Sequence, residues 1–180
     1  LVAIGVTLLG YGGTFIPFTY LSVLLSDIAG FPKHSISTIL FGYGCAMAFG
    51  NLIGGRLANK HTYRSLIWMF TLQTIVLISL TFALDSQIAT LIILIPMGVF
   101  AFSNVPALQF YIVNLTRKRY PGTEDVVSAL NISGFNLGVA IASVIGGLVI
   151  ESNFGLVATP WAGGMMVLSG LALLIISRRI

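Results

Sequence analysis

The sequence predicts an all-α polytopic membrane protein, and two observations predict it: the composition and the spacing of the charges. Of the 180 residues, 57% are apolar and only 8% are charged, whereas charged residues make up about 25% of an ordinary soluble domain. Such a chain cannot cover a water-facing surface with polar groups, so a soluble globular domain and a disordered chain are both excluded.

The charged residues divide the chain into six uncharged runs, each of at least 20 residues. A helix of ~20 residues crosses the ~30 Å hydrocarbon layer of a membrane. The runs are apolar on consecutive residues, whereas the strands of a membrane β-barrel alternate apolar and polar positions. We therefore expect one six-helix bundle over residues 1–180, with spans at about 2–26, 35–58, 65–84, 88–115, 126–150 and 158–177.

Prolines inside two of these spans predict kinks. Pro17 lies in the first span, and Pro96 and Pro106 lie in the fourth. Proline has no N–H to donate and leaves a helical carbonyl without its partner, which bends the helix. In a membrane such bends persist where neighbouring groups satisfy the freed carbonyl.

The basic residues gather in alternate loops. Eight of the nine Lys and Arg residues follow the second span, the fourth span or the sixth, and only Lys33 lies on the other side. Such asymmetry marks the cytoplasmic loops of an inner (plasma) membrane protein of bacteria. We therefore expect loops 56–64 and 117–125 and both termini of this segment in the cytoplasm. The bases at 117–119 set this topology or contact acidic lipids, and their placement argues against nucleic acid as a partner.

Two spans carry a small residue at every fourth position. Such a ridge allows the backbone of another helix to approach closely, so we expect tight helix packing along both. The ridges consist of Gly42, Ala46, Gly50, Gly54 and Ala58 in the second span and of Gly134, Gly138, Ala142 and Gly146 in the fifth.

The sequence carries none of the patterns of an enzyme or a cofactor site. There is no phosphate-binding loop, nucleophile elbow or H-E-x-x-H pattern, so neither an ATP-driven pump nor a membrane protease is predicted. Cys45 is the only cysteine, and His34 and His61 lie in loops, so no metal site is expected. No carboxylate lies in the middle of a span, and Asp27, at the outer end of the first, is the nearest acid.

The loop between the second and third spans carries a recognisable motif. It reads Gly55-Arg56-Leu57-Ala58-Asn59-Lys60, followed by Arg64, and it resembles the G-x-L-a-D-R-x-G-R-R signature of the major facilitator superfamily. In that family the signature joins helices 2 and 3, with a weaker copy between helices 8 and 9. Here Asn59 replaces the usual acid and Lys60 the usual Arg, as in the weaker copy.

Two further stretches are similar to the same family. Residues 134–150 look like helix 11 of bacterial efflux permeases of the arabinose, sugar and drug efflux group, and residues 12–21 fit helix 7. The resemblance implies that the chain is helices 7–12, the C-terminal half of a twelve-helix transporter. Because it begins with Leu inside an apolar run, we expect a piece of a longer protein whose N-terminal six-helix half is its partner.

The loop motif has a physical interpretation of its own. Arg56, Lys60 and Arg64 lie four residues apart, so on a continuous helix they would share one face. Cations on one face can contact a helix C-terminus or a carboxylate and latch the cytoplasmic side in one state. The alternative is that they only set the topology. The expected cytoplasmic gate consists of Gly55, Arg56, Asn59, Lys60 and Arg64.

The resemblance also implies which spans face the transport path. In the family, helices 7, 8, 10 and 11 line it, and these correspond to the first, second, fourth and fifth spans here. For each polar or aromatic side chain on them, helix packing is the alternative role. The candidates for contact with a small-molecule substrate are Tyr11, Phe15, Tyr20, Tyr43, Asn104, Gln109, Asn131, Phe135 and Asn136.

The expected function is secondary active transport by alternating access, without enzymatic activity or a cofactor. The resemblance implies proton-coupled efflux of a small sugar-like or amphipathic drug-like solute. Since a proton-coupled transporter needs a buried titratable group, the coupling carboxylate would belong to the other half. The alternatives are a non-transporting six-helix membrane scaffold and a channel, although no selectivity ring or filter loop is visible.

Overall fold

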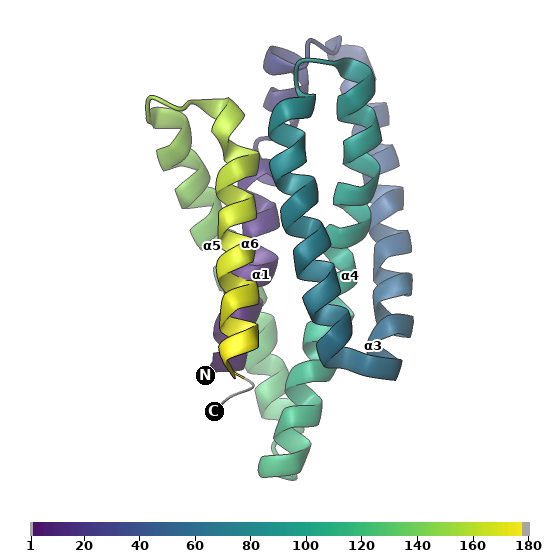
Figure 1. Ribbon diagram of the computed structural model, residues 1–180, viewed down its shortest axis with the longest axis vertical. Coiled ribbons are helices and arrows are strands. Elements are labelled where there is room, and N and C mark those ends of the chain that lie inside the picture. Colours follow the sequence, from purple (N-terminus) through teal and green to yellow (C-terminus); the bar gives the residue numbers. More distant parts are fainter. Residues whose placement is uncertain (1, 178–180) are drawn as a thin grey trace.

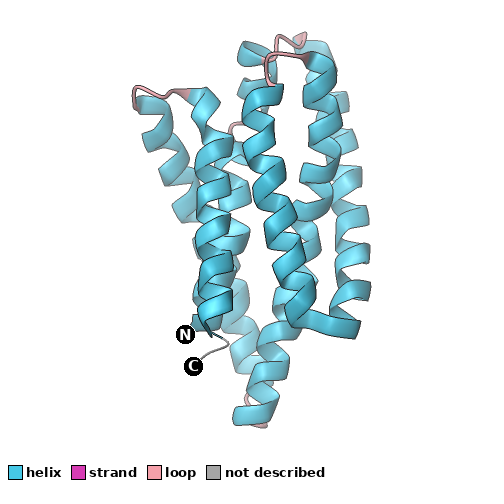
Figure 2. Cartoon of the chain, viewed as in Figure 1, coloured by secondary structure: helices cyan, strands magenta, loops and turns pink. Residues whose placement is uncertain are grey.

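The computed structural model describes residues 2–177, and this part of the chain is helical throughout, with short turns and no strand (Figures 1 and 2). η1 is a short π-helix and η2 a single 3₁₀ turn. The elements are α1 (Val2–Thr19), α2 (Leu21–Val23), η1 (Leu24–Ile28), α3 (Lys33–Ala83), α4 (Gln87–Arg119), α5 (Glu124–Glu151), η2 (Leu156–Ala158) and α6 (Thr159–Ser177).

The first span is broken close to its proline. Pro17 lies inside α1, which ends two residues later at Thr19. Tyr20 then leaves the helical conformation (φ −108°, ψ 12°), and α2 and η1 complete the span. The missing N–H of Pro17 releases the Gly13 carbonyl, and this oxygen lies against Gly163 of α6. In contrast, α4 continues through Pro96 and Pro106.

The second and third spans are two arms of α3. The arms meet at His61, whose φ of −149° and ψ of 69° are not helical. We expected a loop of several residues here, but a single residue turns the chain. The arms, residues 33–60 and 62–83, are about 42 and 33 Å long, so each can cross a membrane. Residues 2–177 therefore form six helical segments, and five continuous helices among them have the length and hydropathy of a membrane span.

The other spans are also long. α4 has 33 residues, about 50 Å, and its C-terminal end projects below the rest of the bundle (Figure 1). Arg117, Lys118 and Arg119 occupy its last turn, where positive charge stabilises the C-terminal end of a helix. The turn to α5 passes through Gly122 at φ 91°, a conformation that glycine adopts without strain.

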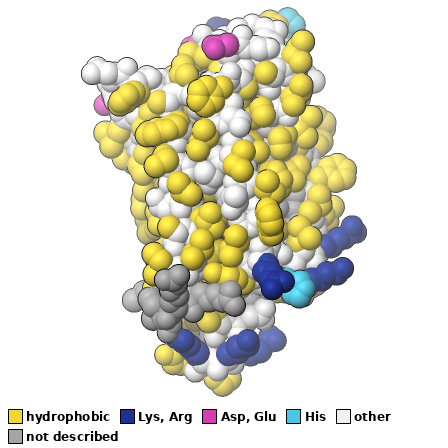
Figure 3. Space-filling model, viewed as in Figure 1, with side chains coloured by type: hydrophobic (Ala, Val, Ile, Leu, Met, Phe, Trp, Pro, Cys, Tyr) yellow, Lys and Arg dark blue, Asp and Glu magenta, His cyan; other side chains and the backbone are white. Residues whose placement is uncertain are grey.

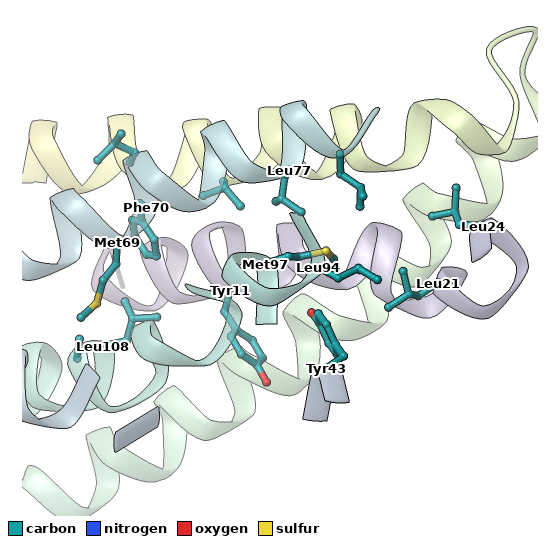
Figure 4. Packing of buried hydrophobic residues seen from close by; sticks show 14 of the residues in the cluster. Tyr11, Leu21, Leu24, Tyr43, Met69, Phe70, Leu77, Leu94, Met97 and Leu108 are labelled. Carbon is teal, nitrogen blue, oxygen red and sulfur yellow. The ribbon is translucent and has the colours of Figure 1, made fainter. Parts of the chain in front are cut away.

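The helices pack in two groups that share α6. α1 packs against α5 and α6, while α3 packs against α4 and α6. Buried apolar side chains such as Phe70, Leu77 and Met97 fill the space between the groups (Figure 4). Large apolar side chains also cover much of the outside (Figure 3), with Phe41 74% and Phe82 78% exposed. So much exposed apolar surface is unusual in water and is suited to lipid.

The α3–α4 seam, defined by Gly50 and Gly54, brings two backbones together. A Cβ at Gly50 would overlap the Val99 carbonyl of α4, and one at Gly54 would overlap the Ser103 carbonyl. Gly42 belongs to the same sequence ridge, but a Cβ there would meet nothing within 4 Å. The expectation of a continuous packed ridge therefore needs correction: Gly42 makes no close approach within this chain.

The α1–α5 seam is defined by Gly134, Gly138 and Gly146. A Cβ at Gly138 would lie 2.8 Å from the Leu8 carbonyl oxygen of α1. At the two flanking glycines the neighbours are side chains, with Ile4 Cγ2 2.9 Å from a Cβ at Gly134 and Tyr20 Cε2 2.5 Å from one at Gly146. Only at the central glycine is a backbone atom the nearest neighbour; at Gly146 the Ile16 carbonyl oxygen lies farther off, at 3.4 Å.

Candidate functional site

An aromatic cluster joins four helices on one side of the bundle. Tyr11 of α1 is its centre, with its ring centroid 4.7 Å from Phe135 of α5, 4.9 Å from Phe15 and 5.8 Å from Phe102 of α4. Phe15 contacts Phe18, which stacks on Tyr43 of α3 with centroids 5.6 Å apart. The cluster therefore connects the first, second, fourth and fifth spans, the four that were expected to line the path.

A groove opens beside this cluster. Its volume is about 460 Å³, and amide and aromatic side chains border it together with apolar ones. A second hollow of about 310 Å³ lies on the other side of Gln109, against Ser128 and Phe110. The groove is lined by Tyr11, Asn51, Val105, Pro106, Gln109, Ile132 and Phe135. None of these side chains is charged.

A first amide network runs from α1 through α5 to α4 along the groove. The Thr7 hydroxyl donates to Asn131 Oδ1 at 2.6 Å, and Asn131 Nδ2 donates to Gln109 Oε1 at 2.8 Å. Gln109 Nε2 in turn donates to the Ser128 hydroxyl. Thr7 and Asn131 are fully buried, whereas Gln109 is half-buried and borders the groove. Gln109 is therefore the member of this network that a solute can reach.

A second amide network lies deeper in the bundle. Asn104 Nδ2 donates to Gln73 Oε1 at 2.7 Å, and Gln73 Nε2 donates to the Thr14 hydroxyl. These side chains connect α4, the second arm of α3 and α1. Asn104 Oδ1 is buried and has no partner among the described residues. A buried carbonyl oxygen of this kind normally accepts a hydrogen bond from water or a ligand.

The remaining path candidates occupy different surroundings. The Tyr20 hydroxyl donates to the Ser143 carbonyl at 3.1 Å, so it connects the break after α1 to α5. The Tyr43 hydroxyl is buried without a partner among the described residues. Tyr11 and Tyr43 point their hydroxyls in opposite directions (Figure 4). Asn136 is exposed on α5, and it does not line the groove.

Three residues of these networks and of the groove were missed from sequence. Asn51 lines the groove, and an amide inside an apolar span is a signal that could have identified it. Gln73 lies on the third span, which the resemblance places away from the path, yet it holds Asn104. Phe102 is one of twelve phenylalanines, and nothing local distinguishes it.

The gate motif is divided by the break in α3. Gly55, Arg56, Asn59 and Lys60 lie on the first arm, and Arg64 lies on the second. The continuous helical face expected for Arg56, Lys60 and Arg64 does not exist, because His61 interrupts the register. Of the three bases only Arg64 borders the hollow of about 390 Å³ between the break and α4.

The groove has no charged lining residue, and positive charge is concentrated at one end of the molecule. Lys and Arg side chains gather at the lower end in Figure 3, and the visible acidic side chains lie at the upper end. Between residues 2 and 177, no three His, Cys, Asp or Glu side chains come together as a metal site. The site can therefore offer hydrogen bonds and aromatic surface to a solute.

Known proteins of similar sequence are membrane transporters. The chain is 48% identical to the MFS-type transporter YtbD of Bacillus subtilis over 168 residues, covering 93% of this chain and 42% of YtbD. It is 30% identical to the inner membrane transport protein YdhP of Escherichia coli, covering 98% of this chain and 44% of YdhP. The chain thus spans less than half the length of these relatives.

The fold is also found among solved structures. The POT family transporter PepTSo superposes with a TM-score of 0.80 at 12% identity, over 99% of this chain and 37% of that one. At this identity the likeness is one of fold. Residues 2–179 match the family described as the Major Facilitator Superfamily. The chain, six spans that cover less than half of its relatives, therefore belongs to the major facilitator superfamily of transporters.

Proposed function

We propose that the full-length protein is a secondary active transporter that exports a small, uncharged, amphipathic or sugar-like solute. The observation that carries this proposal is the uncharged groove of about 460 Å³, where Gln109 and Asn51 lie beside the rings of Tyr11 and Phe135. Amides donate to and accept from hydroxyl groups, and aromatic rings bury the apolar face of a solute. A charged substrate would find no counter-ion in this wall.

The direction of transport is proposed from more distant relatives. One, 24% identical, is named "Chloramphenicol resistance protein" in Streptomyces lividans, and another at the same identity is named "Probable sugar efflux transporter" in Helicobacter pylori. The first name refers to resistance to chloramphenicol, and the second refers to export of a sugar. Export of a neutral, polar organic molecule is consistent with the chemistry of the groove.

Proton coupling is proposed through a group outside these 180 residues. The spans of this chain contain no acid in their middle, and Asp27 is exposed with its carboxylate accepting from the Ser26 hydroxyl at 2.5 Å. An exposed acid of this kind does not provide the buried titratable group that coupling requires. We place the coupling group in the other six-helix half, which we propose as the partner across the path.

The same partner is proposed to engage the basic end of the molecule. We place this end in the cytoplasm of a bacterium, with the protein in the inner membrane, since Lys and Arg mark cytoplasmic loops and gather there (Figure 3). We place both termini of this segment on that side as well. Arg56 and Lys60, exposed on the first arm of α3, are positioned to meet a carboxylate of the other half and hold the cytoplasmic side closed.

The test is transport by the full-length protein in proteoliposomes, with and without a proton gradient. We expect solute flux to depend on the gradient. Gln109→Leu should raise KM about tenfold, because one hydrogen bond to the solute is lost. Gln87→Leu is the matched control: it removes an exposed amide that donates to the Gly30 carbonyl, outside the groove, so it should leave KM unchanged.

Two outcomes would contradict the proposal. Flux that is insensitive to any ion gradient and passive in direction would indicate a channel, and absence of flux for every uncharged solute tried would favour a scaffold. An equal rise of KM in Gln109→Leu and Gln87→Leu would mean that the groove does not contact the solute.

A further inference from the structure

The hollow between the break in α3 and the end of α4 has no part in the proposed transport path. It has a volume of about 390 Å³ and lies at the basic end of the molecule. Three of its lining residues, His61, Arg64 and Lys118, carry basic side chains, and Thr62, Tyr111 and Asn114 add hydrogen-bonding groups. No carboxylate lines it. We call it the basic pocket.

The break that opens this pocket is built into the fold. The Ser65 hydroxyl of the second arm donates to the Leu57 carbonyl of the first arm at 3.0 Å, and the Thr62 hydroxyl donates to the Ala58 carbonyl at 2.8 Å. Side-chain hydrogen bonds thus connect the two arms across the break and hold the open shape.

The positive charge of the pocket is not neutralised by neighbouring acids. On this end of the described chain the acids are Glu124 and Asp125. Glu124 contacts Arg117 at 3.8 Å, and Arg117 does not line the pocket. Cations that converge without a counter-charge bind an anion, and a phosphate oxygen accepts strong charge-assisted hydrogen bonds from them.

The apolar surface beside the pocket favours an anionic lipid over a soluble anion. Trp68 lies one helical turn beyond Arg64 on the second arm of α3 and is 66% exposed, while Leu115 of α4 lines the pocket and is 39% exposed. Tryptophan is enriched at the level of lipid headgroups. A soluble anion would use only the cations, whereas a lipid uses both the cations and this apolar strip.

We propose that the basic pocket binds the phosphate of an anionic phospholipid, with the acyl chains running past Trp68. Arg64 and Lys118, from α3 and α4, hold the phosphate between them. The lipid then links the second arm of α3 to the end of α4 at the membrane surface. The leaflet that would supply it is the cytoplasmic one, where anionic lipids attract basic segments.

The experiment titrates phosphatidylglycerol onto the full-length protein in detergent and follows bound lipid by native mass spectrometry. Arg64→Gln combined with Lys118→Gln should weaken the apparent affinity about tenfold or more, since each cation near the membrane surface contributes measurably to binding. Arg56→Gln combined with Lys60→Gln removes the same charge from outside the pocket and should bind the lipid as the wild type does. Equal losses in the two variants would overturn the proposal in favour of diffuse electrostatic attraction.

A second variant keeps the test independent of folding and of net charge. Trp68→Ala alters an exposed side chain, so the fold is expected to persist, and it should weaken phosphatidylglycerol binding. Inorganic phosphate should not compete with the lipid at equal concentration. Unchanged lipid binding by Trp68→Ala, or full competition by inorganic phosphate, would overturn the lipid in favour of a soluble anion.

Discussion

The α3–α4 seam and the α1–α5 seam are both made by small residues, but different forces hold them. In the α3–α4 seam Gly50 and Gly54 both face backbone carbonyls, which cannot move aside without moving a helix. In the α1–α5 seam only Gly138 has backbone as its nearest neighbour, while side chains are nearest to Gly134 and Gly146. The rest of that seam is held by hydrogen bonds, from Thr7 to Asn131 and from Tyr20 to the Ser143 carbonyl.

The two seams are expected to differ in how freely their helices move. Interlocked backbones move together, so α3 and α4 are expected to shift as one body. Side-chain contacts and hydrogen bonds can be exchanged, and those between membrane helices contribute only about 0.6 kcal/mol each. Under the proposed alternating access, we therefore expect α5 to tilt on α1 beside the groove.

The largest effect is expected for Gly50→Leu. Its side chain would have to displace the α4 backbone at Val99, so the variant should lose about 3 kcal/mol of stability. Thermal unfolding of the full-length protein in detergent measures the loss. Wild-type stability in this variant would mean that the seam is not rigid, and the comparison between the seams would fail.

Gly138→Leu should lose less, about 2 kcal/mol. The same overlap arises with the Leu8 carbonyl, but α5 makes its flanking contacts through side chains and can shift away from α1. The unfolding midpoints of this variant and of Gly50→Leu, measured side by side, test the ranking. A larger loss at Gly138 than at Gly50 would reverse it.

Tyr20→Phe should lose about 0.6 kcal/mol, because one hydrogen bond across the α1–α5 seam disappears. The ring remains and still packs against Gly146. Tyr120→Phe is the matched control, since Tyr120 is 68% exposed in the turn after α4. If the control destabilises as much as Tyr20→Phe does, the hydrogen bond to Ser143 contributes nothing to the seam.

Gly42→Ala is expected to have the smallest effect on stability, and it should raise stability where the other variants lower it. A Cβ at Gly42 would have no neighbour within 4 Å among the described residues. Alanine also lowers the conformational entropy of the unfolded chain, so the variant should gain about 0.5 kcal/mol of stability. The measurement is again the unfolding midpoint of the full-length protein. A loss instead would place the other half of the transporter against Gly42 and add a third seam to the comparison.

The sequence singled out some of the polar side chains of the site. Asn104, Gln109 and Asn131 were path candidates because the resemblance places their spans beside the path, with hydrogen bonding between helices as the alternative role; each is hydrogen-bonded to another helix in the structure. Their partners could not be read from sequence. Gln73, on a span that the resemblance placed outside the path, holds Asn104 because the second arm of α3 packs against α4.

The sequence by itself determined the number of spans, the helical class and the family. These follow from the lengths of the uncharged runs and from a loop motif, both of which are properties of neighbours along the chain. Only the tertiary structure decided that His61 breaks α3 at a single residue. No glycine or proline at positions 56–64 marks that break, and hydrogen bonds from the Thr62 and Ser65 hydroxyls to the first arm connect the two arms across it.

The same division separates Gly42 from Gly50. In sequence they occupy one ridge at the same four-residue spacing, and periodicity treats them alike. In the structure a backbone carbonyl of α4 faces Gly50 and none faces Gly42. A helical repeat specifies which face a residue occupies; which part of that face another helix covers depends on how the two axes cross, and the packing of the whole bundle sets that crossing.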